Sequence, residues 1–440
     1  MASTRKAELA LITEALPAHG TPVTVRVAFS GGRDSHVLLH WLAAQRAALA
    51  PHRLCAVHVD HRLHADSTHW AQHCAAVCAD LDLPLEVLEV DAKGASGESP
   101  EAAARAARYR ALAISMSGGD LVLTAHHQTD QAETLLLALL RGAGLAGAAA
   151  MPARRPFGGG CLLRPLLDWP SSRLAEYAQA HGLNWVPDPS NADNRYDRNF
   201  LRQRVLPVLA EHWPAASVAL ARHAAHAADA QTLLEELATR DGATAQNLPL
   251  TQLVALSAPR QRNLLRCWLR AHGVQAPSTA RLEELRRQAL SAGTDRQPRV
   301  LFGTHAVRVW RGRLYLTSEP LPSAPQTTLS WSPAQALELP GLGRLWAQPA
   351  VGEGIAAALL GEHPLLEVRF RANSSVPGRS LRKRLQTLAV PPWQRQTLPL
   401  LFHGNRLLQI GGEAPLAGWR AGPNQPGIRI LWQSAADRTM

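Results

Sequence analysis

The sequence predicts an α/β protein with a doubly wound parallel sheet, followed by a mainly helical domain and a small α+β domain. The first third of the chain alternates short β-branched runs with helical stretches, which is typical of a parallel sheet covered on both faces. Helical periodicity takes over from about Ala215, and short strand-like runs surround one basic helix after Leu366. We therefore expect domains at residues 1–214, 215–320 and 327–440.

The elements of the first domain follow from apolar runs that are bounded by polar residues, Gly or Pro. In such a sheet, ligands bind beyond the carboxyl ends of the strands, where the winding reverses. The expected elements are strand Val23–Phe29, helix Ser35–Leu49, strand Leu54–Val59, helix His69–Leu81, strand Leu85–Val90, helix Pro100–Met116, strand Asp120–Thr124, helix Thr129–Leu140 and strand Cys161–Leu163.

The remaining elements are helices first and strands later. Arg311-Gly312 indicates the turn of a hairpin, and the Pro- and Ser-rich stretch 318–326 is typical of a linker. The expected elements are helices Val218–Arg240, Leu250–Ala271 and Thr279–Leu290, hairpin strands Ala306–Trp310 and Arg313–Leu316, strands Leu366–Phe370, Leu398–Phe402 and Leu407–Ile410, and helix Ser380–Leu388.

The bulk composition indicates a globular protein of the cytoplasm. No uncharged apolar run reaches the length of about 18 residues that a membrane span needs, and the N-terminus has no signal-peptide core. The five cysteines are scattered and form neither a disulfide framework nor a CxxC pair. Cys74 and Cys78, four residues apart on an expected helix, are interpreted as core-facing thiols.

Positive charge is concentrated near the C-terminus. The net charge is +11, and only Lys6, Lys93 and Lys383 among the basic residues are lysines. The abundance of Arg fits the coding bias of a GC-rich genome. However, residues 366–430 contain ten Arg or Lys against Glu367 and Glu413, and so carry eight of the eleven net charges. Such a local excess favours a polyanionic partner such as a nucleic acid.

The segment Ser30-Gly31-Gly32-Arg33-Asp34-Ser35 follows the first expected strand and precedes a helix. Small residues before a helix N-terminus suit a phosphate group, because the backbone N–H groups can approach it. The Lys of the GxxxxGK[ST] loop is absent, and Asp34 can bind a nucleotide-held Mg²⁺. This combination suggests cleavage between the α and β phosphates. A plain Gly-Gly turn, with Asp34 as a helix cap, is the structural alternative.

The segment Thr124 to Thr134 brings His126, His127, Asp130 and Glu133 to the end of the fourth expected strand. An imidazole there can lie near the phosphates, and Asp130 near a metal ion or a nucleophilic amine. A zinc site is an alternative, although adjacent histidines in an extended segment point to opposite faces. A helix start capped by Thr129 and Asp130 is the structural alternative.

Two further groups of arginines remain ambiguous in the sequence. Arg105 follows Glu101 by one helical turn, a spacing that favours an ion pair over a contact with nucleotide or RNA. Arg198 and Arg202 lie in the polar stretch that begins at Asp188 and becomes an amphipathic helix. They can contact phosphates or lie on a solvated helix face.

The segment from Arg379 to Arg395 interleaves basic residues with an aromatic ring, which suits contacts to a nucleic-acid backbone and stacking on an unpaired base. A solvated helix face is the alternative. The residues expected to bind RNA here are Arg379, Arg382, Lys383, Arg384, Trp393 and Arg395.

Together these motifs resemble the PP-loop ATP pyrophosphatase superfamily and, within it, the tRNA(Ile)-lysidine synthetases. Thr129 departs from the pattern, since that family has Asp there, and His61-Arg-Leu-His64 stands where it has Gly and Arg. The matching blocks are Ser30–Ser35 (SGGxDS), His58–His61 (HVDH), Glu101–Arg105, Thr124–Thr134 (AHHxDDQAET), Leu135–Gly144, Arg164–Leu167, Asp188–Arg202 and Gly378–Gly412.

The resemblance implies a Rossmann-like sheet of the PP-loop/HUP type and an ATP- and Mg²⁺-dependent reaction on tRNA(Ile) with a CAU anticodon. ATP adenylates the C2 oxygen of the wobble cytidine, and the ε-amine of L-lysine then displaces AMP to give lysidine. It implies no membrane and no protein partner. The implied site residues are Asp34 (also for Mg²⁺), Arg105, His127 and Asp130 for catalysis, Ser30, Gly31, Gly32, Arg33, Asp34, Ser35, His58 and His126 for ATP, and Arg198, Arg202, Arg379, Arg382, Lys383, Arg384, Trp393 and Arg395 for tRNA.

Two other functions remain as alternatives. A tRNA thiolase of the same superfamily activates a base in the same way but delivers sulfur, and it usually carries paired or catalytic cysteines. A nucleotide- and RNA-binding protein without catalysis is the second alternative. The presence of Asp34, Arg105 and Asp130 argues against it.

Overall fold

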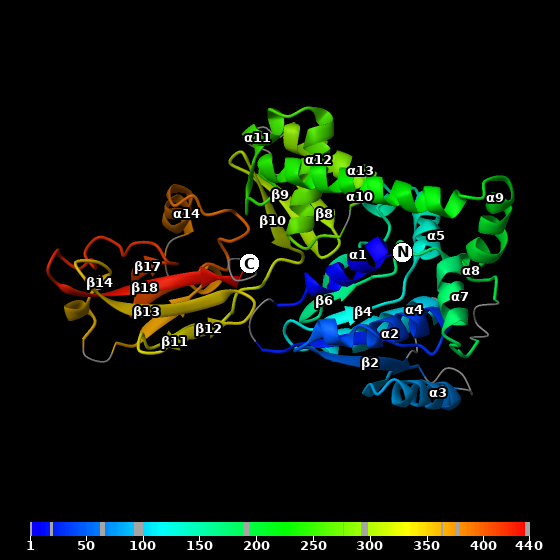
Figure 1. The fold of residues 1–440 in the computed structure, drawn as a ribbon. Helices are drawn as coiled ribbons and strands as arrows, with labels where there is room; N and C mark the ends of the chain where they lie inside the picture. Colours follow the sequence, from blue (N-terminus) through cyan, green and yellow to red (C-terminus); the bar gives the residue numbers. More distant parts are fainter. Residues whose placement is uncertain are drawn as a thin grey trace. The chain divides into compact units, whose positions relative to one another are not determined.

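The computed structural model describes most of the chain. Contacts divide it into two compact units, residues 1–233 and 234–440, each of which has its own core (Figure 1). The described residues are 2–17, 21–61, 67–91, 100–187, 193–275, 277–291, 298–361, 364–374, 376 and 378–435.

The first unit is built on a mostly parallel sheet, which confirms the predicted fold class. The strand order is β3-β2-β1-β4-β6-β5, and every pairing is parallel except that of β5 with β6. The antiparallel edge strand β5 was not predicted. The strands are β1 Thr24–Ala28, β2 Arg53–Asp60, β3 Leu85–Glu89, β4 Leu121–Leu123, β5 Arg154–Phe157 and β6 Gly160–Leu163.

Alternating side chains of the strands fill two separate cores, as a doubly wound sheet requires. In β4, Leu121 and Leu123 face the core that contains α2, α3 and α7, whereas Val122 faces the core of α4. Cys74 and Cys78 of α3 are buried in the first of these cores, which confirms the prediction for them. The helices are α2 Arg33–Ala43, α3 Ser67–Asp80, α4 Pro100–Ile114 and α7 Ser171–Ala180.

The N-terminal helix α1, Ala2–Thr13, was not predicted. Its buried Glu8 accepts hydrogen bonds from Trp169 Nε1 at 2.7 Å and from Arg173 Nη1 at 3.3 Å. The predicted helix Ser35–Leu49 is shorter than expected, because α2 ends at Ala43 and a separate 3₁₀ turn follows. The other helices are α5 Gln128–Leu140, α6 Leu145–Ala148, α8 Asp197–Phe200, α9 Leu206–His212 and α10 Ala216–Arg240, with the 3₁₀ turn at Arg46–Leu49 and a π-helical turn at Leu201–Val205.

The second unit begins within α10 and continues with helices packed on an antiparallel sheet of order β7-β10-β9-β8. The prediction of one helix from Leu250 to Ala271 is wrong. Pro259 lies in the first turn of α12, where a fixed φ favours a new helix start. The elements are β7 Leu248–Pro249, α11 Leu250–Val254, α12 Ala258–Ala271, α13 Thr279–Leu290, β8 Arg299–Phe302, β9 His305–Trp310 and β10 Arg313–Ser318.

The C-terminal part of this unit contains two antiparallel sheets, of orders β11-β15-β16-β17 and β12-β13-β18-β14. Strands β15, β16 and β17 and helix α14 confirm the predicted elements, whereas the second sheet was not predicted. The elements are β11 Leu329–Trp331, β12 Leu337–Leu339, β13 Gly343–Val351, β14 Ile355–Ala356, β15 Leu366–Arg369, α14 Gly378–Thr387, β16 Leu400–His403, β17 Arg406–Ile410 and β18 Pro426–Ser434, with 3₁₀ turns at Ala357–Leu359 and Arg371–Asn373.

No described helix has the length and apolar character that crossing a membrane requires. All five cysteines lie in described parts of the chain, and all five are free thiols.

The buried contacts of Glu8 lead to a stability prediction. Replacing Glu8 with Ala leaves the Trp169 indole N–H and the Arg173 guanidinium without their acceptor, so it should lower the free energy of unfolding of the first unit by about 1 to 3 kcal/mol. Glu14→Ala, an exposed change on the same segment, is the control. Denaturant melts that shift equally for both variants would contradict the prediction.

Candidate active site

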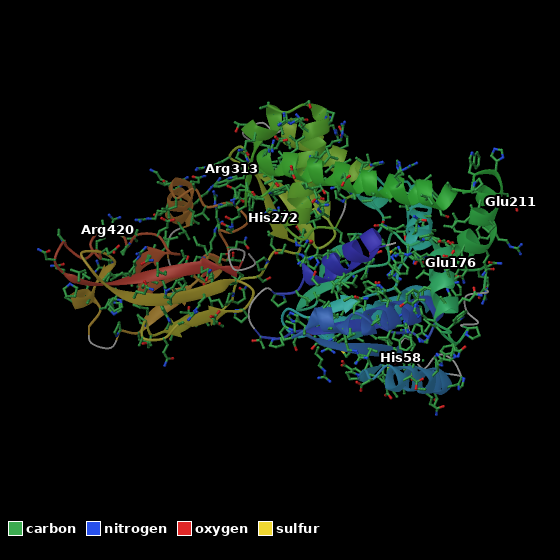
Figure 2. All side chains as sticks on the ribbon, viewed as in Figure 1. His58, Glu176, Glu211, His272, Arg313 and Arg420 are labelled. Carbon is green, nitrogen blue, oxygen red and sulfur yellow. The ribbon has the colours of Figure 1, made fainter. Side chains whose placement is uncertain are left out.

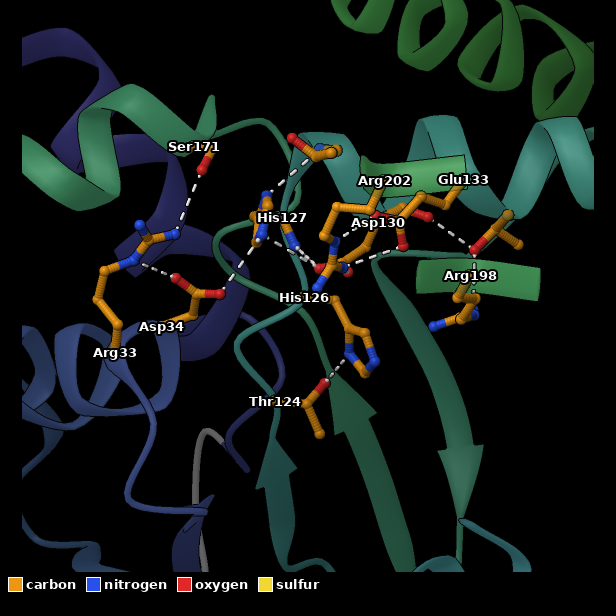
Figure 3. Close-up of polar contacts among 12 residues, drawn as sticks. Arg33, Asp34, Thr124, His126, His127, Asp130, Glu133, Ser171, Arg198 and Arg202 are labelled. Atoms are coloured by element: carbon orange, nitrogen blue, oxygen red, sulfur yellow. Dashed lines mark hydrogen bonds and ion pairs between the residues drawn. The ribbon is translucent and has the colours of Figure 1, made fainter. Parts of the chain in front are cut away.

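The candidate site lies at the point where the winding of the sheet reverses. Strands β1 and β4 are neighbours, and helix α2, which follows β1, packs on the face opposite to helix α4, which precedes β4. The Ser30–Ser35 loop follows β1, and the Thr124–His127 segment follows β4, so both polar segments lie at the same edge. Figure 3 shows Asp34 and His127 directed toward one another across this edge.

The Ser30–Ser35 loop is held by its own hydroxyl groups. Ser35 Oγ donates to the Gly32 carbonyl at 2.9 Å and accepts from the Ser30 backbone N–H at 3.2 Å. Gly31 has φ +81°, and a Cβ there would lie 3.2 Å from Cys74 Sγ. Glycine is therefore needed both for the backbone conformation and for the close approach of α3. These contacts fix the conformation of the loop.

Asp34 is not a helix cap. The N-cap of α2 is Gly32, which has no side-chain cap, and Asp34 lies in the first turn. Its Oδ1 accepts from Arg33 Nε at 2.9 Å, and its Oδ2 lies 3.5 Å from His127 Nε2. Burial alone would raise the pKa of Asp34, but His127 and Arg33 outweigh this effect and hold the pKa below its ordinary value.

His127 joins the two segments and is the true N-cap of α5. Its Nδ1 accepts from the Thr129 backbone N–H at 3.3 Å, and its own backbone N–H donates to Asp130 Oδ2 at 2.9 Å. The alternative in which Thr129 and Asp130 cap the helix is therefore corrected: His127 caps it, and Asp130 closes the capping box. Burial would lower the pKa of His127, but Asp34 and Asp130 raise it above its ordinary value.

Arg202 binds two carboxylates of α5, a role that the sequence did not reveal. Its Nη2 donates to Asp130 Oδ1 at 2.8 Å, and its Nε donates to Glu133 Oε1 at 2.5 Å. Glu133 is fully buried, and burial raises its pKa although Arg202 opposes the effect. The sequence does carry one signal, because two carboxylates three residues apart on one helix face indicate that a cation lies nearby. It does not identify Arg202 as that cation.

His126 points away from His127 and does not complete a zinc site. Its Nδ1 shares a hydrogen bond with Thr124 Oγ1 at 2.8 Å (Figure 3). Burial lowers its pKa, as do the neighbouring charges of Arg164, Arg105 and Arg198. Within the part of the chain that the structure describes, no group of three or more His, Cys, Asp or Glu residues has the arrangement of a metal site.

Three other predicted residues lie outside this cluster. His58, on β2 (Figure 2), is buried, and its Nδ1 lies 2.9 Å from the Phe29 carbonyl, so it braces the end of β1. Arg105 lies over the Tyr109 ring, 5.0 Å from its centroid. Its predicted partner Glu101 has a side chain outside the described residues. Arg198 Nη2 donates to Thr134 Oγ1 at 3.1 Å.

The basic residues of α14 form one exposed helix face, which we call the α14 basic face. Leu381 and Leu385 are buried on the opposite side. Within the described residues, none of its members takes part in an ion pair. Arg384 also lines an open pocket of about 370 Å³ together with Arg406 and Trp419. The face consists of Arg379, Arg382, Lys383 and Arg384.

Trp393 and Arg395 already have protein partners. The Trp393 ring centroid lies 5.3 Å from that of Tyr315 and 6.3 Å from that of Trp310, so the ring packs against the β9-β10 hairpin. Arg395 Nε donates to the Val390 carbonyl at 2.9 Å. Stacking of Trp393 on a base remains a prediction.

The comparisons with known proteins agree with one another and cover most of the chain. A PP-loop domain matches residues 5–209, a TilS substrate binding domain residues 248–315, and a TilS substrate C-terminal domain residues 366–432. The tRNA(Ile)-lysidine synthase of Methylococcus capsulatus is 41% identical over 93% of this chain and 96% of its own. That of Alkalilimnicola ehrlichii is 43% identical over 92% of both chains.

The chain belongs to the tRNA(Ile)-lysidine synthase family. It is an ATP-dependent PP-loop enzyme. The family name and the substrate domain imply a tRNA substrate. In this synthase the PP-loop domain contains the Asp34–His127–Asp130 cluster, and the two TilS domains lie in the second unit.

The raised pKa of His127 leads to a titration prediction. Asp34→Asn removes the hydrogen bond and the charge that favour the imidazolium, so it should lower the pKa of His127 in the folded protein. A group whose pKa is raised by folding stabilises the folded protein at pH values below its ordinary pKa. This contribution is lost as the pH rises through the pKa in the folded protein. The variant should therefore also be less stable than the wild type at acidic pH. NMR titration of the imidazole measures the first effect. An unchanged His127 pKa would contradict it.

Proposed function

We propose that the protein ligates L-lysine to C2 of the wobble cytidine of tRNA(Ile) with a CAU anticodon, through an adenylated tRNA, with release of AMP and pyrophosphate. The observation that carries this proposal is the continuous polar chain from the phosphate loop through Asp34 and His127 to Asp130, Arg202 and Glu133. This arrangement supports the proposal, because side chains suited to phosphate chemistry lie next to side chains suited to an amine.

We assign ATP to the Ser30–Ser35 loop, whose backbone N–H groups and helix terminus favour phosphate oxygens. The donor set fits Mg²⁺. Asp34 is a charged carboxylate, one oxygen of which has no partner closer than 3.5 Å, and Mg²⁺ is commonly bound by one or two carboxylates plus substrate phosphates. When bound, this ion neutralises charge on the pyrophosphate leaving group. Arg33, anchored by Ser171 Oγ at 3.2 Å, fixes the position of the Asp34 carboxylate.

In the first step, the C2 oxygen of the cytidine attacks the α-phosphorus, and the bond to the pyrophosphate oxygen breaks. The chain must hold the α-phosphate in line and stabilise the charge that develops on it. The loop amides are our candidates for the first task. Arg105 is our candidate for the second, because no described carboxylate neutralises its guanidinium, whose only described contacts are with Tyr109.

In the second step, the ε-nitrogen of lysine bonds to C2, and the bond to the AMP oxygen breaks. The ammonium must first be bound and must lose a proton. We assign binding of the ammonium to Asp130, and we name Asp130 and His127, whose Nε2 lies 3.6 Å from Asp130 Oδ2, as the candidates for proton transfer. Arg202 acts as a positioning residue, because its guanidinium donates hydrogen bonds to the carboxylates of both Asp130 and Glu133 and so fixes their positions.

The cysteines disfavour sulfur transfer. Burial raises the pKa of Cys74 to about 12 and that of Cys78 to about 11, and it also raises the pKa of Cys55 and of Cys267. These thiols are therefore not thiolates at neutral pH, and the thiolate is the nucleophile. Five free thiols also suit the reducing cytoplasm, which we propose as the compartment.

We propose three domains at residues 1–214, 215–320 and 327–440. We assign tRNA binding to the second unit. The α14 basic face supports this assignment because its four cations are exposed and have no described counter-charge. The neighbouring Arg395 has a pKa lowered by burial and by the charges of Arg371, Arg382 and Arg311, so the excess charge extends beyond α14. A phosphate backbone would neutralise it.

The function is tested with purified protein, ATP, Mg²⁺, the tRNA and labelled L-lysine. We expect labelled lysine in the tRNA, with one AMP and one pyrophosphate released for each lysine incorporated. Asp34→Asn should abolish pyrophosphate release while tRNA affinity stays the same. Pyrophosphate release without lysine incorporation would overturn the proposal.

The α14 basic face is tested separately by neutralising Arg379, Arg382 and Lys383 to Gln. For every phosphate that the variant no longer neutralises, the slope of log affinity against log salt should fall by about 0.7 to 0.9, and tRNA binding at low salt should weaken. Arg344→Gln is a matched control, because Arg344 is already paired with Glu338 at 3.3 Å. Equal affinities and slopes for the triple variant and the control would remove this face from RNA binding.

A further inference from the structure

Three arginines gather around one tyrosine at the edge of the sheet of the first unit. Arg105 comes from α4, Arg155 from β5, and Arg164 follows β6. The guanidinium carbons of Arg105 and Arg155 lie 5.0 and 5.5 Å from the centroid of the Tyr109 ring. Arg164 leaves the same face of the sheet as Arg155, because Arg155 pairs with Leu162, two residues before Arg164. We call this group the Tyr109 arginine cluster.

The positive charges of this cluster are not balanced by the protein. Within the described residues, no carboxylate forms an ion pair with any of its three guanidinium groups. Arg164 is 4% exposed, and its Nη1 donates to the Pro152 carbonyl at 2.6 Å. The Nε atoms of Arg155 and Arg164 are buried and have no hydrogen-bond partner among the described residues. A buried charged donor without an acceptor is costly, and a bound anion removes that cost.

The packing of the aromatic rings does not satisfy these donors. Arg155 also lies 5.0 Å from the centroid of the Phe157 ring. Such contacts attract the cation to the ring face, but they provide no acceptor for an N–H group that points in the guanidinium plane. Burial lowers the pKa of Arg164, and the positive charges of Arg155 and Arg105 lower it further. The three cations therefore repel one another.

The cluster lies beside the candidate active site but apart from the phosphate loop. The charges of Arg164 and Arg105 reach His126 at the end of β4. Strand β6 is two positions from β1 in the sheet, and β5 is three positions away. At the usual strand spacing, these positions are roughly 10 and 15 Å from the end of β1. Arg155 and Arg164 are therefore placed for a phosphate other than the one in the Ser30–Ser35 loop.

We propose that Arg155 and Arg164 bind a second phosphate group of a substrate, at a site separate from the Ser30–Ser35 loop and beside Arg105, which we assign to the α-phosphate. The identity of the substrate rests on the proposed function. The phosphate belongs either to the RNA backbone next to the reacting cytidine or to the far end of the ATP triphosphate. The distance from the loop favours the RNA backbone. Guanidinium groups suit either source, since they bind phosphate oxygens in pairs.

The site is tested with Arg155→Gln, because Arg155 is partly exposed and the substitution keeps a polar side chain of similar length. Arg154→Gln is the matched control: it is the neighbouring residue of the same strand, it is exposed, and its side chain leaves the other face of β5. Inorganic phosphate should raise the melting temperature of the wild type and of the control more than that of Arg155→Gln. This measurement needs no catalysis, so it stands even if lysine transfer fails.

Binding of tRNA and of ATP distinguishes the two sources. If the phosphate is in the RNA backbone, Arg155→Gln should weaken tRNA binding about tenfold and flatten its salt dependence, while ATP affinity is unchanged. If it belongs to ATP, only ATP affinity should fall. The proposal is overturned if phosphate stabilises Arg155→Gln as much as the wild type, or if both affinities are unchanged. A lower melting temperature alone, with unchanged binding, would show that the cluster only packs α4 on β5.

Discussion

The candidate site depends on a single cation, the Arg202 guanidinium, which neutralises two carboxylates of one helix. Glu133 is fully buried, and removing a charge from water costs several kcal/mol unless a partner is present. Arg202 supplies that partner and at the same time fixes Asp130 beside His127. The imidazole is in turn oriented toward Asp34. Charged contacts therefore connect the loop after β1 with the helix after β4. The cation on which they depend, Arg202, lies in a π-helical turn some seventy positions later in the chain than Glu133.

Local sequence patterns predicted the features that are set by residues close together in the sequence. The βα rhythm, the five parallel strands and the loop of Ser30–Ser35 follow from apolar runs and their boundaries. The break before α12 also has a local signal in Pro259, which the apolar periodicity of Leu250–Ala271 outweighed. The long β13-β18 pairing joins segments about eighty residues apart, and nothing within either segment identifies its partner.

The site shows the same division. Asp34, His127 and Asp130 were found because they follow strands whose ends must meet. The pairing of Arg202 with Glu133 was missed, because an arginine in a polar segment has the same local pattern whether it binds RNA or a buried carboxylate. Trp393 illustrates the converse case. Its basic surroundings suggest an RNA contact, whereas its ring packs against Tyr315 and Trp310, which lie far away in the sequence.

Helix α1 has a consequence for the order in which the site is completed during synthesis. Glu8 precedes its partner Trp169 by 161 positions in the chain. The Trp169 carbonyl accepts the N–H of Gln128 at the start of α5, and Ser171 anchors Arg33. Domains usually fold as units while the chain emerges from the ribosome. The contact of Glu8 with Trp169 can therefore form only after all six strands of the sheet have been made, whereas Arg202, which holds the carboxylates of the site, is made later still.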